Sequence, residues 1–142
     1  MHALSEIRRL LIPNGILIDV RPVLDRWHIE VASMREIRET GRMQDFPLGL
    51  ADDEAANQSM AGAAQNGWFR REQDEFFSFI YSWDTPKEME EWIEEEWEGF
   101  IGLNDETKQA TRAAWASADA DARVRVKVKM LIAKWKVVKG YD

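Results

Sequence analysis

Apolar and polar positions follow two different periods along this chain. Apolar residues recur every three to four positions over 3–11, which predicts an amphipathic helix. Pro13 cannot continue that helix, and the Asn14–Gly15 pair favours a tight turn. The apolar run at 16–18 is continuous, which predicts a strand covered on both faces. The chain therefore opens with a helix, a turn and a strand.

Three later segments have strand-like patterns. Residues 27–32 alternate apolar and polar side chains, and the polar stretch 35–44 completes a predicted hairpin. Residues 76–83 carry no charge on either face, so we expect a central strand covered on both sides, in the same sheet as residues 16–20. Residues 123–137 alternate too, but the apolar phase changes near Leu131, which predicts a bulge or a new packing partner.

Helix signals separate these strands. After a linker at 46–49, Asp52 or Asp53 caps a helix that runs to about Gln65. Residues 85–88 combine an N-cap Thr, a Pro at the first helical position and a capping-box Glu. The helix that follows is predicted to carry an apolar side as far as Phe100.

The opening segment, A-L-S-E-I-R-R-L-L-I-P-N-G at 3–15, resembles a motif of class I S-adenosylmethionine-dependent methyltransferases. The consensus sequence of this motif in the family is A-L-x-E-I-x-R-V-L-K-P-G-G, followed by an apolar strand. This chain departs from it at Ile12, where Lys is usual, and at Asn14, where the first Gly is usual. In that family the motif opens the C-terminal half, which has a strand, a helix, a parallel strand and a final antiparallel strand inserted between the two.

The resemblance implies an α/β fold for residues 1–142, with a partial Rossmann-like methyltransferase sheet. The predicted β-hairpin at about 27–44 and a helix pair at about 86–118, whose second helix Asn104 caps, would be additions to that sheet. In the family a cofactor-binding half precedes the motif, whereas here the motif begins at Ala3. The chain therefore resembles the half of an enzyme that lacks the cofactor loop.

The spacing of the glycines indicates whether this chain could bind the cofactor of that family. The family holds S-adenosylmethionine with a Gly-rich loop, because the backbone must approach the ligand closely. None of the eight glycines of this chain is two residues from another. We therefore expect no cofactor binding and no methyltransferase activity by this chain alone. The expected role is to complete a sheet, either as a homodimer or with a partner chain that carries the cofactor half.

The alternative is a small-molecule-binding module or a methyltransferase enzyme that uses a pocket at the sheet rim. Ligands of open α/β sheets sit beyond the carboxyl ends of parallel strands. The resemblance places 19–22, 81–84 and the start of the last strand at that rim. The candidate acceptor-pocket residues are Asp19, Arg21, Tyr81, Trp83 and Arg123. The plainer interpretation is that Arg21 is the ion partner of Asp19, and that the two aromatic residues belong to the core.

His28 is a further candidate for this rim, as a general base whose reference pKa lies near neutrality. Its plainer interpretation is a partly exposed strand residue, since the sequence places no acidic or nucleophilic partner beside it. No His or Cys spacing predicts a metal site.

Composition narrows the class of protein. The chain is 45% hydrophobic and 32% charged, which is typical of globular proteins. It has no cysteine, and no apolar run approaches the roughly 18 residues of a membrane span. The formal net charge of −7 disfavours nonspecific nucleic-acid binding. We therefore expect a cytoplasmic protein that has no membrane segment.

Overall fold

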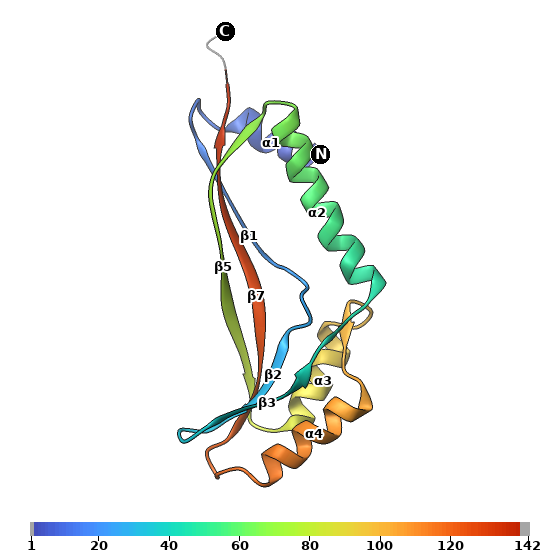
Figure 1. Cartoon of the computed structure of the whole chain (residues 1–142). Helices are drawn as coiled ribbons and strands as arrows, with labels where there is room; N and C mark the ends of the chain where they lie inside the picture. Colours follow the sequence, from blue (N-terminus) through green and yellow to red (C-terminus); the bar gives the residue numbers. More distant parts are fainter. Residues whose placement is uncertain (1, 140–142) are drawn as a thin grey trace. The chain divides into compact units, whose positions relative to one another are not determined.

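The computed structural model describes residues 2–139 as an α/β fold with four helices (Figure 1). In chain order the elements are α1 (His2–Leu10), β1 (Ile16–Pro22), β2 (His28–Ala32), β3 (Ile37–Arg42), β4 (Gln44–Asp45), α2 (Pro47–Gln65), β5 (Phe69–Trp83), α3 (Pro86–Glu96), β6 (Ile101–Gly102), α4 (Asp105–Ala116) and β7 (Arg123–Val137). β4 and β6 form a separate two-stranded ladder.

The long strand β7 organises the main five-stranded sheet. Residues 130–136 of β7 pair antiparallel with β1, and residues 123–127 pair antiparallel with β2, which also pairs with β3. β5 pairs with β7 too, and Trp68 just before β5 accepts a hydrogen bond at 2.9 Å from Val138 just after β7. β5 is therefore antiparallel to β7 and runs in the same direction as β1 (Figure 1). The last strand thus lies between two strands of common direction.

The chain divides into two compact units. The first contains described residues 2–22, 52–77 and 130–139, and the second contains 23–51 and 78–129. Both segments that we predicted to be additions, the hairpin at 27–44 and the helix pair at 86–118, belong to the second unit. The first unit keeps the opening helix and β1, most of α2, and the adjoining parts of β5 and β7.

The first unit packs its helices against one face of its strands. Met60 and Ala63 of α2 are buried against alternate residues of β7, from Ala133 to Val137, and against Phe69 of β5. The apolar side of α1 adds Leu4, Ile7 and Leu11. Figure 1 shows both helices on the same side of these strands. The predicted helix at 3–11 is confirmed in this packing.

The second unit buries the alternate valines of β7 together with β2. Val124 and Val126 lie directly opposite Val31 and Ile29, and all four are buried. Val31 packs with Ala114 of α4 and with Ala122. On α3, Met89 and Ile93 are buried. The predicted hairpin is confirmed, with a bulge between Ile29 and Glu30.

The predicted change of phase in the last strand is confirmed. Before residue 129 the buried residues are Val124, Val126 and Val128, and from residue 131 onward they are Leu131, Ala133, Trp135 and Val137. The change falls where the pairing partner of β7 changes from β2 to β1. One strand therefore serves two cores, and each part presents its apolar residues to its own helices.

Two strand predictions are wrong in part. β5 begins at Phe69 and lies beside β7 as an edge strand, and its residues from Arg70 to Ile80 are exposed. β1 lies in the same sheet, as expected, but alternate residues on one face are exposed. The error has a physical cause, because an apolar run is buried on both faces only where two layers cover it. The described helices of the first unit pack against one face.

Two helix boundaries also differ from the prediction. α2 begins at Pro47, so the segment 46–49 is not a linker. Proline is favoured in the first helical turn, because its missing N–H has no partner there in any case. α3 ends at Glu96, before Phe100. Its predicted start is confirmed, since Thr85 accepts a hydrogen bond from the backbone N–H of Glu88.

Candidate functional site

The structure divides the six predicted rim residues between the two units. Asp19 and Arg21 belong to the first unit, and His28, Tyr81, Trp83 and Arg123 belong to the second. Each of these residues has a hydrogen-bond, ion-pair or aromatic contact within its own unit. Two further features are the free edge of β1 in the first unit and a polar hollow in the second unit, and the sequence did not indicate the hollow.

Asp19 and Arg21 form an ion pair on β1. The Nε atom of Arg21 donates to Oδ2 of Asp19 at 3.2 Å, and its Nη2 donates to Oδ1 of Asn57 on α2 at 2.7 Å. Both charged side chains are more than four-fifths buried. The plainer interpretation of this pair is therefore confirmed, since Arg21 ties β1 to the helix that covers it.

His28 stands in a chain of hydrogen bonds on one face of the hairpin. Its Nδ1 lies 2.6 Å from Oε1 of Glu39, and its Nε2 lies 2.6 Å from Nη2 of Arg42. Because the guanidinium can only donate, Nε2 accepts and Nδ1 carries the proton that Glu39 accepts. The side chain is 40% exposed, as predicted, but it does have an acidic partner. The bulged pairing of β2 with β3 brings that partner from eleven residues away.

Tyr81 and Trp83 lie in an aromatic cluster with α3 and its C-cap. The ring centroid of Tyr81 lies 5.2 Å from that of Trp97 and 6.1 Å from those of Trp83 and Trp92. Trp27 joins through Trp97, with centroids 5.5 Å apart. Tyr81 and Trp83 stack nearly parallel, and the other pairs pack edge-on or tilted. The cluster therefore holds β5 against α3, and Trp92 remains 38% exposed.

Arg123 pairs with the residue that follows β5. Its Nε donates to Oδ1 of Asp84 at 3.1 Å, and both side chains are exposed. The backbone carbonyl of Asp84 also accepts a hydrogen bond from Nε1 of Trp115 on α4. Arg123 thus helps to fix the turn between β5 and α3.

The outer edge of β1 is the open strand edge that the expected sheet-completing role requires. β1 ends the strand order of the sheet, and no strand of the described chain pairs with its other edge. Ile16, Ile18 and Val20 point to the face opposite the helices and are 49%, 50% and 50% exposed. Across the sheet they lie opposite Lys136, Lys134 and Ile132 of β7. An apolar strand edge of this kind is a template for pairing with another strand.

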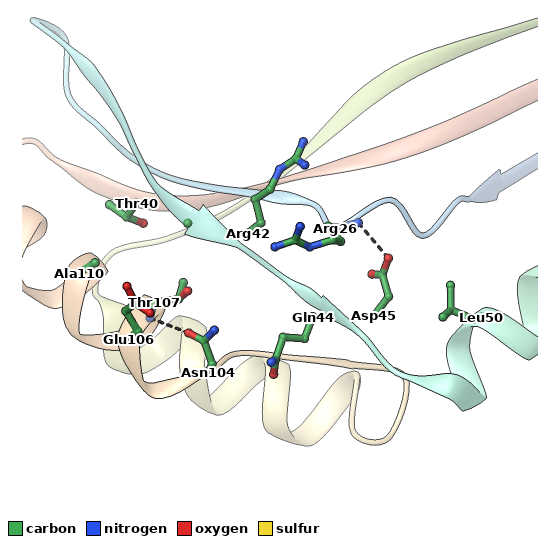
Figure 2. Close-up of a pocket in the computed structure, with 11 residues that line it drawn as sticks. Arg26, Thr40, Arg42, Gln44, Asp45, Leu50, Asn104, Glu106, Thr107 and Ala110 are labelled. Atoms are coloured by element: carbon green, nitrogen blue, oxygen red, sulfur yellow. Dashed lines mark hydrogen bonds between the residues drawn. The ribbon is translucent and has the colours of Figure 1, made fainter.

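The second feature is a hollow of about 780 Å³ in the second unit. Figure 2 shows it between the loop before β2, the strands β3 and β4, and the start of α4. Its lining is mostly polar and includes Arg26, Gln44, Asp45, Asn104 and Glu106. In the sequence these residues are dispersed over 80 positions in separate polar segments. Only the Asn104 helix cap was identifiable in advance, as a structural signal.

Other classes of site find no support in the described part of the chain. Among residues 2–139, no group of three or more His, Cys, Asp and Glu side chains is placed to hold a metal ion. No helix there is both long enough and apolar enough to cross a membrane. Comparisons with protein-family models, with curated proteins and with solved structures found no match for this chain.

Proposed function

We propose that this chain is the C-terminal half of a methyltransferase-like sheet and acts by completing that sheet. The free edge of β1 receives a strand from a cofactor-binding half. The chain supplies the last three strands and contributes no contact to the cofactor. S-adenosylmethionine binds only where that partner half is present.

One observation carries this proposal, namely the order of strands in the first unit. β7 lies antiparallel between β1 and β5, which share a direction, and a helix precedes β1. This is the arrangement implied by the opening motif at residues 3–15. The two predicted additions belong to the second unit, and the first unit contains the helix and the strands that this proposal assigns to the methyltransferase-like sheet.

The exposed side of β1 gives the proposal its physical basis. A strand that ends a sheet leaves a row of backbone N–H and C=O groups without strand partners. A seven-residue neighbour would satisfy these groups and cover Ile16, Ile18 and Val20 on one face. Burying half-exposed apolar side chains stabilises the pair at roughly 25 cal/mol per Å² of apolar area removed from water.

Calorimetry with S-adenosylmethionine tests this proposal against a self-contained enzyme. We expect no heat of binding from the isolated chain at micromolar concentration, because it has no pair of glycines with the G-x-G spacing of the cofactor loop. Thermal denaturation is the second readout, since a ligand that binds only the folded chain raises Tm. A dissociation constant in the low micromolar range would show that this chain binds the cofactor without a partner half.

A small-molecule-binding module is the second candidate function. The observation that favours it is the polar hollow of the second unit, which has the volume of known ligand sites. This candidate does not involve β1, so the two functions are compatible in one chain.

A further inference from the structure

The hollow of the second unit contains a guanidinium that points into open space. Arg26 has a left-handed backbone conformation, with φ at +46°. Its backbone N–H donates to Oδ2 of Asp45 at 3.0 Å, which fixes this conformation from the β4 side. Figure 2 shows its side chain extending from the loop over the hollow. Within residues 2–139 the guanidinium has no hydrogen-bond or ion-pair partner.

Two other charged groups of the lining each have a hydrogen-bond partner, although Oδ1 of Asp45 is buried without one. Arg42 donates to Nε2 of His28 at 2.6 Å, and Figure 2 shows its side chain turned away from the hollow. The carboxylate of Asp45 accepts from the backbone of Arg26. The positive charge available to a ligand on this wall is therefore that of Arg26.

The opposite wall offers a negative charge at the start of α4. Glu106 lies in the first turn of this helix, is exposed, and has no ion pair within the described residues. Beside it, Oδ1 of Asn104 accepts the N–H of Thr107 at 2.8 Å, so the Asn104 amide NH₂ remains available as a donor. Leu50 and Ala110 add apolar contact to the lining. Among the described residues, the lining thus combines the unpaired guanidinium of Arg26, the unpaired carboxylate of Glu106 and an apolar patch.

We infer that this hollow binds a small zwitterion, a free α-amino acid with an apolar side chain. The planar guanidinium of Arg26 matches the two oxygens of a carboxylate. Glu106 receives the ammonium group, and Leu50 contacts the side chain. A dianion such as phosphate fits less well, because Glu106 and Asp45 would repel it. This inference rests on the second candidate function, small-molecule binding in the hollow, and is independent of sheet completion because it uses no residue of β1.

The test is a titration of the full ¹⁵N-labelled chain with L-leucine, followed by amide chemical shifts. We expect saturable shifts at lining residues, such as Gln44, Asn104 and Thr107. Sodium acetate and n-butylammonium chloride each carry half of the recognised group, so each should bind at least tenfold more weakly. Inorganic phosphate should give no saturable shift at these residues.

Two charge-removing variants and two matched controls complete the test. Arg26→Gln and Glu106→Gln should each weaken L-leucine binding at least fivefold. Arg38→Gln and Glu36→Gln remove the same charges from an exposed pair of the hairpin outside the hollow, and should leave the affinity unchanged. Arg26→Lys keeps the positive charge but loses the paired N–H donors of the planar guanidinium, and should give an intermediate affinity. The amide spectrum of each variant shows directly whether it is folded.

Three outcomes would overturn the inference. The first is the absence of saturable shifts in wild type at tens of millimolar L-leucine. The second is acetate binding as tight as L-leucine binding, which would indicate a simple anion site. The third is equal affinity for wild type and folded Arg26→Gln. None of them bears on sheet completion through β1.

Discussion

At the scale of single residues, close backbone approaches decide where the second unit can tolerate change. A Cβ atom built on Gly41 would lie 2.7 Å from Cγ2 and 2.8 Å from Oγ1 of Thr107. Thr107 is buried on α4, so its side chain has little room to move. Glycine at position 41 therefore lets β3 lie directly against α4, which also sets one wall of the hollow.

We predict that Gly41→Ala destabilises the protein by about 1–3 kcal/mol, the usual range for overpacking a core. Thr107→Ala removes the two closest atoms, so the double variant should lose less stability than the sum of the two single variants. Urea denaturation of all four proteins measures this coupling. Simple additivity would show that the contact between β3 and α4 relaxes without strain.

An exposed ion pair in the same unit makes stability depend on pH. Nζ of Lys129 donates to Oδ2 of Asp25 at 3.0 Å, and this hydrogen bond lowers the pKa of Asp25. A lowered pKa in the folded state gives stability that is present above the ordinary pKa of Asp and is lost as pH falls through the lowered value. Solvent screens the pair, so its contribution is no more than roughly 1 kcal/mol.

Asp25→Asn should therefore lower Tm slightly at pH 7, and the difference from wild type should disappear in acid. Thermal melts at pH steps from 7 down to 2 measure this trend. High salt at pH 7 should also reduce the difference, because the pair is exposed. A difference in Tm that stays constant from pH 7 to pH 2 would mean that Asp25 acts through packing and not through charge.

At the scale of elements, local sequence signals predicted the starts of α3 and α4 correctly, but they did not predict the start of α2 or the layers that cover the strands. Thr85 and Asn104 are N-caps in the structure, as predicted, because a cap depends on contacts within four residues. The layers that cover β1 and β5 depend on distant parts of the chain, so apolar runs alone misled the burial prediction. The sequence also did not indicate an acidic partner for His28, because Glu39 comes beside it only through the bulged pairing of the hairpin.

The cap at Thr85 supports an element-scale prediction. Its Oγ1 accepts the N–H of Glu88 at 3.2 Å, and a carboxylate oxygen of Glu88 accepts the N–H of Asp84 at 3.3 Å. Thr85→Ala should destabilise the protein by about 1 kcal/mol. Thr85→Ser keeps the hydroxyl and should retain most of the stability. Equal losses for both variants in urea denaturation would assign the effect to the methyl group of Thr85.

At the scale of the whole molecule, the α/β class and the positions of the hairpin and the helix pair could be predicted from the sequence, while the candidate site could not. The order of β1, β7 and β5 was implied by the resemblance of residues 3–15, together with the positions of both additions. The hollow lies among elements of the second unit. Arg26 itself has the left-handed backbone conformation, and no spacing rule in the sequence identifies such a residue. A site that assembles from single residues of separate loops leaves no periodic signal in the sequence.

The free edge of β1 supports a prediction about assembly. The hairpin pairs with β7 through β2, and its strands do not pair with β1. When no cofactor-binding half is present, we expect two copies to pair through their β1 strands about a two-fold axis. An axis centred on Ile18 places Ile16 opposite Val20 of the partner subunit, which forms a continuous apolar row. Light scattering at micromolar concentration should then give twice the 16.5 kDa mass of the chain.

Cysteine chemistry tests the register of that pairing, because the natural chain contains no cysteine. In the proposed dimer, Ile18 meets its own copy across the axis, and the Cα atoms of opposite residues in an antiparallel pair lie about 4.5–5.5 Å apart. That distance suits a disulfide, so Ile18→Cys should form a covalent dimer on mild oxidation. Met34→Cys in the second unit is a more accessible control, since Met34 is 96% exposed and Ile18 is 50% exposed, and it should remain mostly monomeric on a denaturing gel. A 16.5 kDa species in light scattering, with no more covalent dimer from Ile18→Cys than from Met34→Cys, would rule out self-pairing through β1.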